Sequence, residues 1–187
     1  MARVKPVIKL TVWKDICIIP EYAEFTNYEI SSTGLVRNKT TQCISKPCIN
    51  KISGYLQTGL WQKPYRKTIA VHRLLALLFI ENIDNKELVD HVNGNKTDNR
   101  LDNIRWVSQS ENAMNSKIRS HNTSGYKNIL LTYNRQRKPI WKISVTTDKK
   151  IRTKTFKRNT EEPPPEVIKC RDKMLKDLHK DFACFRI

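Results

Sequence analysis

The chain has 187 residues, with 35 Lys or Arg against 18 Asp or Glu, and therefore a formal net charge of +17. A solvated surface does not need this excess, so the charge favours a polyanionic partner, nucleic acid above all. Hydrophobic residues make up 39% of the chain, which allows a modest core. We identify no signal peptide and no apolar run long enough to cross a bilayer. An intracellular, soluble protein with no membrane partner is therefore expected, and nothing in the composition implies a protein partner.

Residues 1–70 have the pattern of a small β-rich module. Residues 29–37 predict a strand, a Gly turn and a second strand, and residues 54–61 and 67–71 predict a further hairpin. We expect the aromatic side chains of Trp13, Tyr28 and Trp61 to belong to its core.

Residues 71–118 predict a helix followed by a β-β-α unit. The helix is indicated by apolar residues at the i, i+3, i+4 and i+7 spacing: Val71, Leu74, Leu75 and Leu78. Residues 87–91 and 104–107 are expected to be short strands. Ser108 and Glu111 have the spacing of a capping box, which places the start of the second helix at about Ser108.

Residues 119–187 predict a three-stranded antiparallel sheet packed on one helix, so the fold class of the whole chain is α+β. Strands are expected at residues 126–133, 140–147 and 151–156. In the middle strand, Trp141, Ile143 and Val145 share one face. In the third strand, Phe156 falls on the same side as Arg152 and Lys154, so its alternation is imperfect.

Positive charge is concentrated in this part of the chain. Residues 116–158 contain thirteen Lys or Arg and a single acid, Asp148, and therefore carry +12 of the +17 charges. Such asymmetry predicts a dedicated nucleic-acid-binding segment.

The cysteines do not indicate a metal site. The chain has five of them, Cys17, Cys43, Cys48, Cys170 and Cys184, without a Cys-x-x-Cys pair or zinc-finger spacing. We interpret them as reduced intracellular thiols and expect no structural zinc.

The run from Leu88 to Asn112 brings one imidazole and several oxygen ligands together, which suits metal-assisted cleavage of a phosphodiester. A neutral histidine at His91 can take the proton of an attacking water, and hard oxygen ligands such as Asp90 and Asn112 suit Mg²⁺. Asn115 lies one helical turn further on and is a rival ligand. Adjacent strand residues point to opposite faces, so Asp90 and His91 can share a site only if the strand end is distorted.

Other polar residues of this run are interpreted as structural. Asn103 is expected to pin the loop or hold the imidazole, and Asp102 to face solvent. His72 is expected to be a structural hydrogen-bonding residue. The Asn, Gly and Asp residues of the loop are interpreted as ordinary turn residues: Asn93, Gly94, Asn95, Asp98 and Asn99.

Three stretches of the chain resemble known modules. Asp90-His91, Gly94-Asn95-Lys96, Asn99, residues 103–107 and Asn112 resemble the HNH nuclease motif of phage-type homing endonucleases, as does the preceding Val71–Ala76 segment. Residues 13–16, 28–37 and 54–56 resemble the NUMOD4 module often fused to such nucleases. Residues 124–127, 141–143 and 154–156 resemble the AP2 DNA-binding domain.

The resemblance implies specific roles. It makes His91 the residue that activates water and Asn103 the structural middle Asn of the catalytic site. It makes Asp90 and Asn112 the ligands of one divalent metal, most simply Mg²⁺, with Mn²⁺ as an alternative. The bent finger of the family would also bring Asp90 and His91 to one site. The AP2-like sheet would contact DNA through basic candidates: Arg135, Arg137, Lys142, Arg152 and Lys154.

Together these features predict a metal-dependent, site-specific DNA endonuclease of the HNH homing type that acts on double-stranded DNA. The alternative is a DNA-binding regulatory protein whose HNH unit is inactive. A monomer and a dimer both agree with the sequence.

Overall fold

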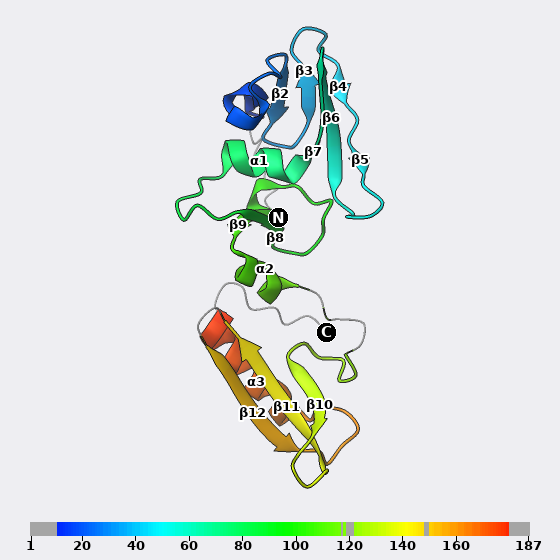
Figure 1. Ribbon diagram of the computed structural model, residues 1–187, viewed down its shortest axis with the longest axis vertical. Helices are drawn as coiled ribbons and strands as arrows, with labels where there is room; N and C mark the ends of the chain where they lie inside the picture. The colour runs from blue at the N-terminus through cyan, green and yellow to red at the C-terminus, as the bar shows by residue number, and fades with distance from the viewer. Residues whose placement is uncertain (1–10, 117, 119–121, 148–149, 180–187) are drawn as a thin grey trace, which may run out of the picture. The chain divides into compact units, whose positions relative to one another are not determined.

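The computed structural model describes residues 11–116, 118, 122–147 and 150–179. Antiparallel sheets and α-helices occur together along these residues (Figure 1), which confirms the predicted α+β class. The chain divides into two compact units, one that ends at Trp106 and one that begins at Val107. The boundaries expected after residues 70 and 118 separate three modules that were recognised from sequence patterns, and these boundaries stay predictions.

Two antiparallel sheets form most of the first unit. One has the strand order β1-β2-β3-β4 and the other has the order β5-β6-β7. Their bounds are β1 Trp13–Asp15, β2 Tyr28–Ser31, β3 Val36–Asn38, β4 Ile44–Ser45, β5 Cys48–Ile49, β6 Leu56–Gln62 and β7 Tyr65–Ala70. Two short 3-10 helices, η1 (Ile16–Ile18) and η2 (Pro20–Tyr22), join β1 to β2. The predicted hairpins are present as β2–β3 and β6–β7, so the β-rich prediction is confirmed.

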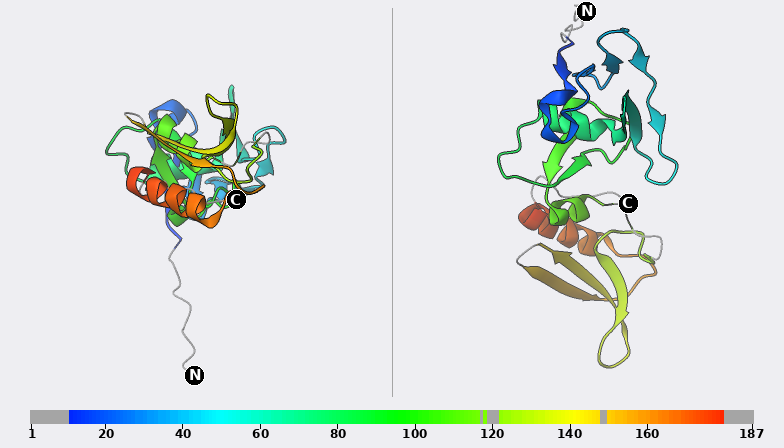
Figure 2. Two further views of the ribbon diagram at one scale, coloured as in Figure 1. Left: turned by 90° about the horizontal axis from the view of Figure 1, so that it is seen from below. Right: turned by 45° about the horizontal axis from the view of Figure 1, so that its top comes forward.

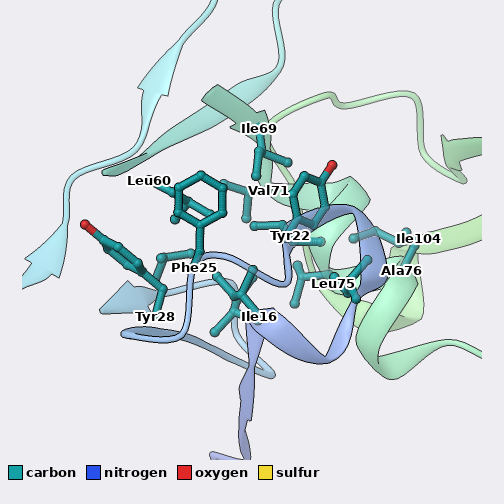
Figure 3. Close-up of a cluster of buried hydrophobic side chains, with 14 of the residues drawn as sticks. Ile16, Tyr22, Phe25, Tyr28, Leu60, Ile69, Val71, Leu75, Ala76 and Ile104 are labelled. Carbon is teal, nitrogen blue, oxygen red and sulfur yellow. The ribbon is translucent and has the colours of Figure 1, made fainter. Parts of the chain in front are cut away.

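Helix α1 (Val71–Phe79) completes the core of this unit (Figure 3). Its Leu74 and Leu75 side chains are fully buried, as is Leu60 of β6. Ile104, the first residue of β9 (Ile104–Val107), belongs to the same cluster. Because the N-terminal strands, α1 and β9 bury their apolar faces against one another, a single hydrophobic core joins the first predicted region to the start of the second.

The three aromatic residues expected in this core have different environments. Tyr28 is buried, and Trp13 is half-buried with the Arg37 guanidinium 3.9 Å from its ring centroid. Trp61 is 62% exposed, so the prediction that it is a core residue was wrong. Side chains of a strand alternate between faces, and because the neighbouring Leu60 faces the core, Trp61 faces outward.

Two strands and a 3-10 helix carry the motif residues of the first unit. β8 (Leu88–His91) pairs with β9 in a two-stranded sheet, and η3 (Leu101–Asn103) precedes β9. Both strands were predicted.

In the second unit, α2 (Gln109–Asn115) begins with the predicted capping box. The Ser108 hydroxyl accepts a hydrogen bond from the Glu111 amide at 3.2 Å, and the Glu111 carboxylate accepts one from the Ser108 amide at 2.7 Å. These two bonds satisfy amide donors that a helix start otherwise leaves without partners, which is why the helix begins here.

The remainder of the second unit is an antiparallel sheet of order β10-β11-β12 with α3 along one face (Figure 2), as predicted. The bounds are β10 Ile129–Tyr133, β11 Pro139–Thr146, β12 Ile151–Lys157 and α3 Pro165–His179. The face of Trp141, Ile143 and Val145 is buried against Val167 and Leu175 of α3. Within the described parts of the chain, no helix combines the length and the apolar character needed to cross a membrane.

A lysine next to this sheet binds the end of α2. The Lys127 ammonium lies 2.6 Å from the Met114 carbonyl oxygen and 2.5 Å from that of Ser116, and it also reaches the Ala113 carbonyl. The last carbonyls of a helix carry partial negative charge and have no partner within the helix. Lys127 therefore satisfies the C-terminal end of the short helix that carries Asn112.

We expect Lys127→Met to loosen α2. Loss of a cation from a helix C-terminus costs about 1 kcal/mol, which corresponds to roughly five-fold faster opening. Hydrogen exchange of the amides of residues 109–115 would measure this change. Lys138→Met, which removes an equal charge from an exposed turn position, serves as the control. Equal exchange in the two variants would show that Lys127 does not support α2.

Candidate functional site

His91, the last residue of β8, is held inside the first unit. Its side chain is 2% exposed, and its Nε2 atom lies 2.9 Å from Oδ1 of Asn99. An amide oxygen accepts hydrogen bonds and cannot donate them, so Nε2 of the neutral ring must carry the hydrogen. In this tautomer the lone pair resides on Nδ1, which is then the nitrogen that can accept a proton.

Two further rings pack around the His91 imidazole. The ring of Tyr55, which precedes β6, is stacked on it at 5.8 Å between centroids and 22° between planes. The ring of His72, from α1, lies 5.0 Å from it. Tyr55 and His72 also contact each other at 4.5 Å. Residues from three separate segments thus restrict the orientation of one imidazole.

His72 is held in its neutral form. It is 7% exposed, and its buried Nδ1 atom has no hydrogen-bond partner among the described residues. Burial, together with the nearby His91 and Arg73, lowers the pKa of His72 to about 4. A neutral neighbour adds no positive charge beside His91, and the packing of the His72 ring against Tyr55 and His91 fits a structural role.

Asp90 has a partner of its own on the neighbouring strand. Its Oδ2 atom lies 3.1 Å from a terminal nitrogen of the Arg105 guanidinium, and both side chains are largely buried. Asp90 thus contacts Arg105 while His91 contacts Asn99, Tyr55 and His72. Adjacent residues of a strand are expected to point to opposite faces. Burial raises the pKa of the Tyr55 hydroxyl and the Asp90 carboxylate raises it further, so Asp90 and His91 share Tyr55 as a neighbour.

Asn103 ties the loop after β8 to η3. Its Oδ1 atom accepts a hydrogen bond from the Asn93 amide at 2.9 Å, and its Nδ2 atom donates to the Asn93 side chain at 3.0 Å and to the Asp98 carbonyl at 2.7 Å. The Asp98 carboxylate accepts hydrogen bonds from the side chains of Arg100 and Asn93. These bonds lower the pKa of the carboxyl to about 2, and the bond from Arg100 has the larger effect. The loop that carries Asn99 is therefore closed by bonds within it.

The metal-ligand candidates fall in both units. Asp90 belongs to the first unit, whereas Asn112 and Asn115 lie on α2 in the second. Asn112 is exposed and Asn115 is half-buried. Among the residues that the structure describes, no three His, Cys, Asp or Glu side chains gather as a metal site. The donors here are one carboxylate and amide oxygens, a set that suits Mg²⁺, which takes one or two carboxylates and completes its shell with water and phosphate oxygens.

The five DNA-binding candidates do not share one face of the sheet. Residues directly opposite each other in an antiparallel pair lie on the same face. Arg152 is opposite Val145 and Lys154 is opposite Ile143, so both are on the face that α3 packs against, although they are exposed.

The other three candidates lie elsewhere. Lys142 aligns with Leu130 and Thr155 on the face turned away from α3. Arg135 and Arg137 are exposed in the turn between β10 and β11.

Sequence reasoning missed part of this site. Asn99 belongs to the motif likeness but is interpreted there as a turn residue, whereas in the structure it is 9% exposed and binds His91. Tyr55 was noted only within a sequence likeness, and Arg105 was not singled out. No periodicity along the chain signals such contacts, because they join segments that the core brings together.

Comparison with known proteins matches two segments of the chain. Residues 70–114 match a family described as HNH endonuclease, and residues 12–61 match the NUMOD4 motif. The uncharacterized HNH endonuclease L245 of Acanthamoeba polyphaga mimivirus is 38% identical over 120 residues, which are 64% of this chain and 32% of L245. Protein 3.8 of Escherichia phage T7 is 33% identical over 101 residues, which are 52% of this chain and 74% of that protein.

A further relative is DNA endonuclease I-HmuI of Bacillus phage SP01. It is 37% identical over 107 residues, which are 57% of this chain and 58% of I-HmuI. A solved structure that describes DNA binding and cleavage by the HNH homing endonuclease I-HmuI aligns with 38% identity over 56% of each chain, at a TM-score of 0.49. This chain therefore spans about a third of L245 and less than two thirds of I-HmuI.

The lowered pKa of His72 predicts a pH-dependent stability. The unfolded chain binds a proton at His72 near the ordinary histidine pKa of 6.5, whereas the folded chain does so only at about 4. Folding stability should therefore fall as the pH drops from 6.5 towards 4, by up to about 1.4 kcal/mol per pH unit from this group.

His72→Phe, which keeps a flat ring without the titrating nitrogen, should flatten that dependence. Urea unfolding of both proteins across this pH range would measure it, and the difference between the two curves isolates His72 from other titrating groups. Parallel curves would contradict the assignment.

Proposed function

Because the chain belongs to the HNH endonuclease family, we propose that it is a metal-dependent, site-specific DNA endonuclease of the homing type. The observation that carries this proposal is the placement of His91. It is the histidine of the Asp-His pair within the family match, and its hydrogen bond to Asn99 leaves Nδ1 as the proton acceptor. A general base needs both a lone pair and a fixed direction, and this imidazole has both.

In the proposed reaction His91 acts on a water molecule. Nδ1 takes a proton from the water as its oxygen attacks phosphorus, and the bond from phosphorus to the 3′ oxygen breaks. The products are a 5′-phosphate and a 3′-hydroxyl once the leaving oxygen has gained a proton. The Nε2 hydrogen stays bonded to Asn99 and holds the ring while its charge changes.

Asp90 and Asn112 are the proposed ligands of one divalent metal, and Asn115 is the alternative to Asn112. When bound, such a metal neutralises charge on the phosphate and stabilises the leaving oxygen. Arg105 contacts the Oδ2 atom of Asp90, so it can orient the carboxylate for this role. Asn103 is proposed as the residue that keeps the loop of Asn99 in place.

Double-stranded DNA is the proposed substrate. The net charge of +17, with most of it between residues 116 and 158, suits a polyphosphate. The sheet of the second unit is the proposed binding surface, in the manner of an AP2-like domain. The second candidate function, a DNA-binding regulator, shares this surface and differs only in lacking cleavage.

Replacement of His91 tests the catalytic proposal. His91→Ala should bind DNA about as well as wild type but cut it ~10²–10⁴-fold more slowly, since the proton acceptor is lost while the basic residues of the second unit are unchanged. Single-turnover cleavage of target DNA with Mg²⁺ gives the rate, and electrophoretic mobility gives the affinity.

Chelation of divalent ions should stop cutting by wild type, and added Mg²⁺ or Mn²⁺ should restore it. Tight binding by a wild-type protein that never cuts would favour the regulator instead.

The two faces of the C-terminal sheet give a second test. The face turned away from α3 is the one that a DNA groove can approach, so Lys142→Ala should weaken DNA binding more than Arg152→Ala does. We expect about ten-fold weaker affinity for the first and less than about three-fold for the second, with a salt slope reduced by about 0.9 for each lost phosphate contact. Titrations at several salt concentrations measure both effects. The reverse order would place the DNA on the other face.

A further inference from the structure

We propose that the turn Ser53-Gly54-Tyr55 of the N-terminal module is a positioning element for His91, and thus a part of the nuclease site itself. This inference rests on the proposed function of His91 as the base. The turn precedes β6 and lies outside the segment that matches the HNH endonuclease family, residues 70–114. In this proposal the chemistry of the nuclease segment depends on the N-terminal module.

The first argument is the contact of Tyr55 with the imidazole. The two rings are nearly parallel, at 22° and 5.8 Å between centroids, and His72 packs against both. Asn99 holds the ring by its edge, at Nε2. A hydrogen bond at the edge of an imidazole opposes rotation of the imidazole about that bond only weakly. A second ring stacked on its face opposes this rotation directly. Tyr55 therefore supplies a restraint that Asn99 does not.

The second argument is that the turn also holds the loop after β8. The Lys96 ammonium donates a hydrogen bond to the Ser53 carbonyl at 2.7 Å and lies 4.8 Å from the centroid of the Tyr55 ring. The stem of Lys96 passes next to Gly54, where an added Cβ would lie 3.4 Å from Lys96 Cδ. Gly54 has φ +76°, a conformation that favours glycine. Ser53 and Tyr55 thus contact Lys96, and Gly54 between them leaves room for the Lys96 stem.

The third argument is that the turn is itself well held. The Asn50 side chain accepts hydrogen bonds from the amides of Ile52 and Ser53, both at 2.9 Å. The Asn50 backbone exchanges further bonds with Gly54 and Tyr55, at 2.7 and 2.9 Å. A turn closed in this way can fix the position of a ring that it carries. The restraint on His91 therefore continues through Tyr55 to the β5–β6 hairpin.

The experiment compares two substitutions of Tyr55. Tyr55→Phe keeps the flat ring, whereas Tyr55→Leu keeps similar bulk without it. Misplacing a catalytic group by about 1 Å can cost about 100-fold in rate. We expect Tyr55→Leu to lower the rate at saturating DNA by at least about ten-fold, with KM and affinity within about two-fold of wild type. Tyr55→Phe should cut within about three-fold of wild type, and so should the control Tyr65→Leu, at an exposed position of β7.

A second measurement reports on the imidazole without any cleavage. Nitrogen-15 spectra of the histidine side chains, recorded where imidazoles are neutral, should show His91 with its hydrogen on Nε2 in wild type and in Tyr55→Phe. In Tyr55→Leu the same signal should shift or split between tautomers. Should Tyr55→Leu not fold, as judged by circular dichroism, Lys96→Met replaces it, because that change alters an exposed side chain and removes the contacts of the loop after β8 with Ser53 and Tyr55. We expect Lys96→Met to lower the maximal rate and to shift the His91 signal in the same direction as Tyr55→Leu.

The outcomes separate the two proposals. If wild type cuts no DNA, the proposed function fails, and the histidine spectra still decide whether the turn positions His91. If wild type cuts and Tyr55→Leu cuts as fast, with an unchanged His91 signal, the positioning role is wrong while the nuclease proposal stands. A rise in KM at an unchanged maximal rate in Tyr55→Leu would also overturn the positioning role, since that result indicates that Tyr55 contacts DNA.

Discussion

The shared hydrophobic core of the first unit is the constraint on which the candidate site depends. Leu60 of β6, Leu74 and Leu75 of α1, and Ile104 of β9 are buried in one cluster. Their burial sets the position of α1 against the sheet and therefore places His72 beside the turn that carries Tyr55. It also anchors β9 and, through strand pairing, β8 with His91. Without this core the three rings, which come from distant parts of the sequence, would not meet.

The same packing sets the chemistry of the imidazole. Burial holds His72 neutral, as its lowered pKa indicates, and so keeps a second positive charge away from His91. Asn99 selects the tautomer, and Asn103 closes the loop on which Asn99 sits. In the second unit, the Ser108 capping box and Lys127 secure the two ends of α2. His91 in the first unit and α2 in the second are thus each supported by residues that take no part in the proposed reaction.

The fold could be predicted from the sequence to the extent that it follows local rules. Strand alternation, the apolar spacing of α1 and the capping box of α2 are properties of neighbouring residues, and the structure confirms each of them. Trp61 shows the limit of this reasoning. Its aromatic character suggested burial, but the register of β6 turns Leu60 inward and Trp61 outward. Arg152 and Lys142 likewise fall on opposite faces of the sheet through strand pairing.

The sequence by itself determined the order and type of most elements, though not of β1, β4, β5 or the 3-10 helices, and identified His91, Asp90, Asn103 and Asn112 as the chemical candidates. Spacing carries this information because a turn, a strand end and a helix start are built from adjacent residues. Only the tertiary structure decided what surrounds those candidates: Tyr55 and His72 on the ring of His91, Asn99 on its Nε2, and Arg105 on Asp90. These contacts arise from the burial of apolar faces by segments far apart in the chain, which no local pattern encodes.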